Sequence, residues 1–198
     1  MEEKDLEYLD SFEAGLVKEM VGLCTSLGML DGTLLESDDI NAKWKEIAPE
    51  YMADAVPELN AFPEAAIGWA GYIGMAIAKW WDEDWGKNHG KKYEALHGKR
   101  GFDDMDDHIV HDVLGYPAGS TEAGVVAKIL LSCTQLAIDK IRHEKTESQS
   151  VLAFHVFARA VRAMFKIGEA MELKRLGYRF QKVQLNTVAA DRNGKPLS

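Results

Sequence analysis

Seventeen residues in the middle of the chain, AAIGWAGYIGMAIAKWW from Ala65 to Trp81, contain a single charge, Lys79. At helical spacing this stretch has two faces. The larger side chains lie on one face: Trp69, Ile73, Ala76, Ile77 and Trp80. The smallest residues lie largely on the other face: Gly68, Gly71, Gly74 and Ala78. A helix that is apolar all round is normally buried on all sides. Each glycine costs roughly 1 kcal/mol relative to alanine in a helix interior, so the three glycines predict close approach of a second helix backbone.

The same stretch has to be weighed as a membrane span. A span needs about 20 apolar residues. This run is shorter, follows Glu64 and is interrupted by Lys79. We therefore predict a buried core helix and no membrane partner.

The composition bounds the class of protein. The chain has 198 residues, of which 46% are hydrophobic and 28% charged, as expected for a soluble domain with a core of its own. Its net charge of −9 argues against nucleic acid or an anionic membrane as a partner. The acidic N-terminus lacks the apolar run of a secretory signal. Cys24 and Cys133 have no CxxC partner and are expected to be core residues in a reducing compartment. We expect a cytoplasmic location.

Apolar periodicity predicts about six helices and no alternation of strands with helices, hence an all-α fold. Pro49 falls inside the second helix and predicts a kink or a restart. Pro57 and Pro63 bracket an expected loop, and Gly177 fits the position just after the last helix. Six longer helices are expected. The first spans 9–30, and the second follows the capping candidates 37–39 and includes Ile40 to Tyr51; the others span 65–81, 103–114, 121–143 and 148–176. A short additional helix is expected at 91–96. The prediction is a single-domain bundle over residues 1–177, built around the glycine-rich helix.

Residues 178–198 are expected to form an extended, basic C-terminal tail. The segment YRFQKVQLNTV, residues 178–188, is the one strand-like stretch, and we expect it to be extended coil or to pair with another chain. The segment from Lys174 onward carries +5, whereas residues 1–173 carry −14. This asymmetry favours a tail that folds back on its own body or on a second copy, so a homo-oligomer is a possible partner. A solvated tail is the alternative.

The segment DDMDDHIVHD, Asp103 to Asp112, has the highest density of ligand-type side chains. On a helix the offsets of three and four place most of these side chains on one face, a spacing that suits a divalent metal. The candidate metal ligands are Asp104, Asp107, His108, His111 and Asp112. The alternative is a solvated face, because Phe102, Met105, Ile109 and Val113 form an apolar stripe opposite.

The pair His111-Asp112, followed by Val-Leu-Gly, resembles the histidine–aspartate (HD) metal phosphohydrolases over these few residues. Those all-α enzymes bind metal through an upstream His, the His-Asp pair and a distant Asp. The resemblance implies that His89 is the upstream ligand and Asp139 the downstream one.

A basic stripe runs along the last helix, at spacings of four, three and four: His155, Arg159, Arg162 and Lys166. It would bind an anionic ligand or a phosphate. The alternative is the polar face of an amphipathic helix, paired with nearby acids. Four tryptophans offer a similar choice between a pocket or interface and plain core packing: Trp69, Trp80, Trp81 and Trp85.

Two function classes follow. We favour a non-enzymatic binding or assembly protein, with a small-molecule ligand that the sequence does not specify. The alternative is a metal-dependent hydrolase built on the Asp103–Asp112 cluster, and a divalent metal is expected as a cofactor only in that case.

Overall fold

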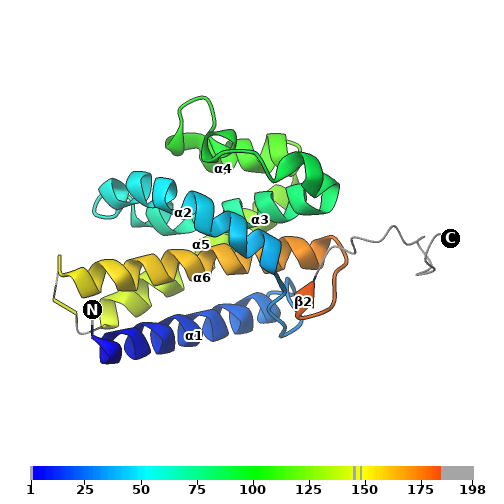
Figure 1. Ribbon diagram of the computed structural model, residues 1–198. Coiled ribbons are helices and arrows are strands. Elements are labelled where there is room, and N and C mark those ends of the chain that lie inside the picture. The colour runs from blue at the N-terminus through cyan, green and yellow to red at the C-terminus, as the bar shows by residue number, and fades with distance from the viewer. Residues whose placement is uncertain (1, 145, 148, 184–198) are drawn as a thin grey trace.

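A computed structural model describes residues 2–144, 146–147 and 149–183. It confirms the predicted all-α, single-domain bundle, in which five long helices carry the core (Figure 1). The elements in chain order are α1 (Glu3–Ser26), β1 (Glu36–Ser37), α2 (Asp38–Glu58), α3 (Pro63–Asn88), η1 (Tyr93–Leu96), η2 (Phe102–Asp104), α4 (Met105–His108), η3 (Ile109–Val113), α5 (Thr121–His143), α6 (Val151–Arg175) and β2 (Lys182–Val183).

Helix α3 is the buried centre of the bundle. Between residues 66 and 81 only Trp69 and Lys79 are partly exposed. A Cβ atom at Gly74 would lie 2.7 Å from the backbone nitrogen of Glu169 and would overlap the carbonyl oxygen of Phe165. A Cβ atom at Gly168 would overlap the carbonyl oxygen of Gly71. The predicted close approach is therefore present, and α6 is the helix that makes it.

Serine caps begin helices α5 and α6, and a glycine follows the end of α6. Ser120 and Ser150 cap α5 and α6, and their hydroxyl oxygens accept hydrogen bonds from Ala123 N (3.2 Å) and Ala153 N (3.1 Å). Gly177 follows α6 with a φ of 97°, a left-handed conformation that favours glycine.

Helix boundaries differ from the prediction in several places. Helix α1 spans Glu3–Ser26 instead of 9–30. Helix α2 includes Pro57 and ends at Glu58, so the loop expected between Pro57 and Pro63 is shorter than predicted. Helix α2 continues through Pro49, and no restart occurs there. Pro49 is exposed, so the carbonyl that loses its hydrogen bond can turn toward water while the opposite face of α2 remains packed. Helix α3 continues past the polar residues after Trp81 to Asn88, with one non-helical residue, Asp84.

The start of the C-terminal tail lies on its own bundle. Strand β2 pairs in parallel with β1, so the expectation of coil or of pairing with another chain is wrong for residues 182–183. A two-residue partner strand carries too little sequence signal to be foreseen. Val183 is 4% exposed, Lys182 lies 3.1 Å from Asp38, and the Tyr178 hydroxyl donates to Asp82 at 2.9 Å. The rest of the predicted tail lies outside the described residues.

By length and composition alone, one helix among the described residues, α5, would reach across a membrane. In the bundle 39% of its most apolar window is buried. A core helix of a soluble protein has the same composition, so this helix alone is weak evidence for a span.

Candidate functional site in the groove between α1 and α6

The basic stripe of α6 faces α1, and the two helices run side by side in the same direction (Figure 1). Three of its four predicted residues converge on one carboxylate, that of Glu13. Arg159 Nη1 lies 2.7 Å from Glu13 Oε2, and Lys166 Nζ lies 2.9 Å from Glu13 Oε1. Arg162 Nε is more distant, at 3.4 Å from Glu13 Oε1. The fourth residue, His155, does not line this groove and instead packs edge-on against Phe154.

Glu13 is 5% exposed, so its charge depends on these neighbours. Burial by itself raises the pKa of the Glu13 carboxyl. The hydrogen bond from Arg159, together with the nearby charges of Lys166 and Arg162, outweighs burial and holds this pKa below its usual value. Glu13 is therefore a carboxylate at neutral pH and acts as the anionic centre of the cluster.

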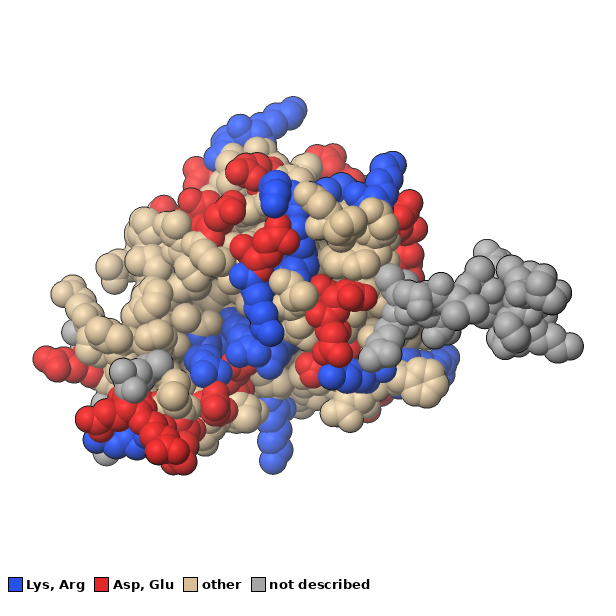
Figure 2. Space-filling view, viewed as in Figure 1, with Lys and Arg blue, Asp and Glu red and all other residues tan. Residues whose placement is uncertain are grey.

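A groove of about 790 Å³ opens beside this cluster, lined by α1, α6, the loop after α1 and Gln181. Its lining holds four cations, with Lys18 as the fourth, and two acids, Glu13 and Asp10. The groove therefore carries a surplus of two positive charges in a protein of net charge −9. Figure 2 shows the Lys and Arg side chains gathered between α6 and α1 on this face.

The groove changes character along α1. Its cationic part lies beside the middle of α6. There Arg159 also forms an ion pair with Asp10, with Nη1 2.8 Å from Oδ1. Its continuation toward the end of α1 is lined by Val21, Thr25 and Leu34. A ligand with a charged head and an apolar body would match this order of surfaces.

The Asp103–Asp112 cluster forms a different structure from the predicted helix. Its chain passes from 3-10 (η2) through α (α4) to π (η3) geometry. In the π turn, Leu114 N bonds to Ile109 O at 2.8 Å, so side chains three apart no longer share a face. The described residues contain no group of three His, Cys, Asp or Glu side chains arranged to hold a metal.

The individual candidate ligands have other partners. His108 contacts Asp112 Oδ2 through Nδ1 at 2.8 Å and Ala95 O through Nε2 at 3.3 Å. His111 turns away, and its Nδ1 lies 2.7 Å from Tyr116 O. Asp104 accepts from Arg100 N at 2.9 Å, and Asp107 is exposed. The structure thus brings together one pair of the five, and metal binding stays a prediction that elemental analysis of the purified protein tests.

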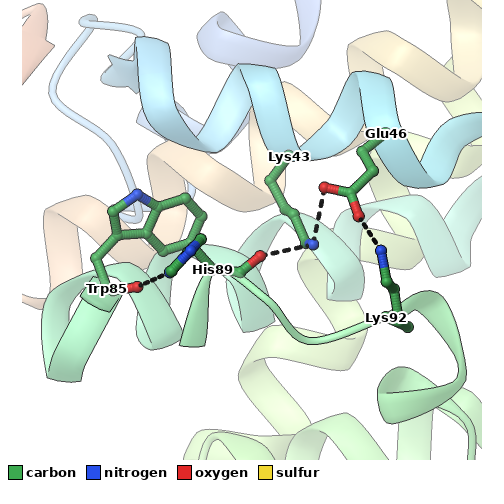
Figure 3. Close-up of polar contacts among 5 residues, drawn as sticks. All are labelled: Lys43, Glu46, Trp85, His89 and Lys92. Atoms are coloured by element: carbon green, nitrogen blue, oxygen red, sulfur yellow. Dashed lines mark hydrogen bonds and ion pairs between the residues drawn. The ribbon is translucent and has the colours of Figure 1, made fainter. Parts of the chain in front are cut away.

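His89 and Asp139, implied by the HD resemblance, do not join this segment in a metal-holding group within the described chain. His89 follows α3, and its Nδ1 lies 2.9 Å from Trp85 O (Figure 3). Asp139 lies on α5, where its nearest cation is Arg142 at 3.7 Å.

Sequence reasoning missed a buried lysine beside His89. Lys43 is 4% exposed, and its Nζ donates to His89 O at 2.8 Å and pairs with Glu46 at 3.0 Å (Figure 3). Glu46 also pairs with Lys92 at 3.0 Å. The contacts join α2 to the end of α3 and satisfy a terminal carbonyl of that helix. Position 43 lies within the apolar stripe of Ile40 and Ile47, and that spacing was the available signal.

Another buried glutamate, Glu169, lies on α6 close to the basic stripe. It is fully buried, and its Oε1 accepts from Ser37 N at 2.6 Å. Its Oε2 has no hydrogen-bond partner among the described residues. Burial raises the pKa of this carboxyl well above its usual value, and the charges of Glu36 and Asp38 add to the effect. Burial therefore shifts the pKa of Glu169 upward, whereas the cations around Glu13 shift the pKa of Glu13 downward.

Comparison of the chain with protein-family models, with curated proteins and with solved structures found no match.

Proposed function

We propose that this protein is a non-enzymatic binding protein whose α1–α6 groove takes a ligand with a phosphate or carboxylate group. The observation that carries the proposal is the convergence of Arg159, Arg162 and Lys166 on a single buried carboxylate. One cation would neutralise Glu13, and the others leave positive charge facing the groove.

Arg162 is the residue best placed to meet the ligand. Its side chain is 42% exposed, against 22% for Arg159 and 18% for Lys166. Within the described chain, Arg162 has no hydrogen bond, and its only ion pair is the 3.4 Å approach of Nε to Glu13. A free guanidinium fork matches carboxylate and phosphate oxygens in pairs.

The electrostatics favour binding over chemistry at this site. A general acid or base works best with a pKa near the operating pH. The pKa of Glu13 is instead lowered by its cations, so it remains ionised. In this proposal Glu13 offsets part of the cationic charge and so competes with the ligand for Arg159, Arg162 and Lys166.

Calorimetric titration of the full-length protein tests the proposal, with inorganic phosphate, acetate and decanoate as probes. Saturable binding of phosphate or of a carboxylate is expected, and decanoate should bind more tightly than acetate if the apolar half of the groove contributes. Arg162→Ala should abolish binding while the melting temperature is kept. Arg142→Ala, which removes an exposed arginine of α5, is the matched control. Unchanged binding by Arg162→Ala would exclude the groove as the site.

A further inference from the structure

A second cavity, of about 390 Å³, lies between the end of α2, the start of α3 and the loop before η2. It shares no lining residue with the α1–α6 groove, so what it binds is independent of the function proposed above. Its volume falls at the lower end of the range for small-molecule sites. Two kinds of side chain dominate its lining, aromatic rings and carboxylates.

The rings of Trp69, Phe102 and Phe62 form one side of the cavity, the aromatic wall. A hydrogen bond and ring contacts hold two of them in place. Trp69 Nε1 donates to Phe102 O at 2.8 Å, which fixes the indole against the loop. The rings of Trp69 and Phe102 are near parallel, 28° apart with centroids at 6.4 Å, and Tyr72 meets Trp69 edge-on at 6.1 Å. Phe62, at the corner between α2 and α3, completes the wall and is 62% exposed. The ring of Phe62 is therefore open to solvent at the edge of the cavity.

The charge around these rings is negative. Glu58, Glu64 and Asp103 line the cavity, and Arg100 is its one lining cation. Arg100 is directed to Asp104, with Nε 3.7 Å from Oδ2, and no cation–π contact joins it to a described ring. Glu58 and Asp103 have no ion pair in the described part of the chain, and Glu64 has only a hydrogen bond from Gln135 at 3.2 Å.

We propose that this cavity binds the guanidinium group of a small ligand or of an arginine side chain. A guanidinium is planar and weakly hydrated, so it stacks on an indole or phenyl face. Its N–H groups radiate in the plane, where they meet carboxylates at the rim. The aromatic wall and the three carboxylates supply both halves of this recognition, and the binding involves no covalent step.

The test is a titration of the full-length protein followed by tryptophan fluorescence and calorimetry. Arginine amide is the probe, and citrulline amide, its uncharged analogue of similar shape, is the control ligand. Saturable binding of arginine amide and none of citrulline amide is expected. A Gly-Arg-Gly peptide amide separates the two sources: tighter binding than arginine amide assigns a peptide side chain, and weaker binding assigns a free small molecule.

Variants at the rim locate the site without disturbing the core. Phe62→Ala, Glu58→Gln and Asp103→Asn should each weaken arginine amide at least about fivefold, the equivalent of about 1 kcal/mol. Phe154→Ala and Glu7→Gln, an exposed Phe and an exposed Glu elsewhere, should leave the affinity unchanged. Equal binding of citrulline amide, equal affinity in all five variants, or no saturation by arginine amide up to about 10 mM would overturn the proposal. Equally tight binding of tetramethylammonium, which has no N–H donor, would overturn the guanidinium assignment.

Discussion

At the scale of single residues, Glu13 and Glu169 show how environment decides the state of a buried carboxyl. Glu13 has three cations around it and a lowered pKa. Glu169 has a backbone N–H from Ser37, an unpartnered Oε2 and a raised pKa. Replacing either by glutamine keeps the shape and removes the ionisable group, so the pair offers a controlled comparison of burial with pairing.

The two substitutions should have opposite dependence on pH. The folded-state pKa of Glu13 lies below the ordinary value of 4.5, so its contribution to stability is present above pH 4.5 and is lost as pH falls through the folded pKa. The folded-state pKa of Glu169 lies above 4.5, so its contribution is present below pH 4.5 and is lost as pH rises through the folded pKa.

At pH 8 we therefore expect Glu13→Gln to lower the free energy of unfolding by about 1 to 3 kcal/mol, because its cations lose their partner. Glu169→Gln should leave that free energy within about 1 kcal/mol of the parent or raise it, and should flatten its decline above pH 5. Urea denaturation at several pH values measures both. A large loss at pH 8 on Glu169→Gln would show that this carboxylate is charged and needed.

At the scale of the elements, the crossing of α3 and α6 fixes the bundle. Gly168→Ala should lower the free energy of unfolding by several kcal/mol, because the new methyl group overlaps the carbonyl oxygen of Gly71 and the helices must separate. Gly71→Leu should act similarly, because a Cβ there already lies 2.8 Å from Leu130 Cδ2.

Gly22→Ala in α1 is the matched control. Nothing lies within 4 Å of its added Cβ, and alanine is the better helix former, so a gain of about 0.5 to 1 kcal/mol is expected. Thermal melts of the variants decide the point. Equal melting of Gly168→Ala and the parent would refute the close contact.

The elements also show what could be predicted from sequence. The glycines of α3 predicted a close helix contact, but not that Gly168 of α6 would meet them, because helical periodicity does not identify the partner helix. The π turn after His108 separated side chains that regular spacing had placed together. Glu13 falls on the apolar stripe of Leu9 and Leu16, and a charge at such a position could have identified the groove.

At the scale of the whole molecule, the start of the tail joins β1 on an otherwise helical body. Deletion of residues 178–198 should lower the melting temperature, because it removes the β1–β2 pairing and the buried Val183. Light scattering of the same variant tests the predicted homo-oligomer. If the tail joins two copies of the chain, the truncated protein should have a lower molar mass in solution than the parent. Unchanged melting would show that the strand contact contributes nothing.

In the proposed function, the α1–α6 groove is the place where this acidic protein presents cations to a ligand. If Glu13 competes with the ligand for those cations, removing its charge should strengthen anion binding even as it weakens the fold. An ordinary network of structural ion pairs would show only the loss of stability. The two accounts therefore differ in the sign of one binding effect.

The direct measurement is the dissociation constant of inorganic phosphate for Glu13→Gln, by calorimetry at a temperature where circular dichroism shows the variant folded. Glu46→Gln is the matched control, since Glu46 also pairs with two lysines but lies outside the groove. We predict that Glu13→Gln binds phosphate at least about fivefold more tightly than the parent, and that Glu46→Gln binds it as the parent does. Unchanged or weaker binding by folded Glu13→Gln would contradict the account.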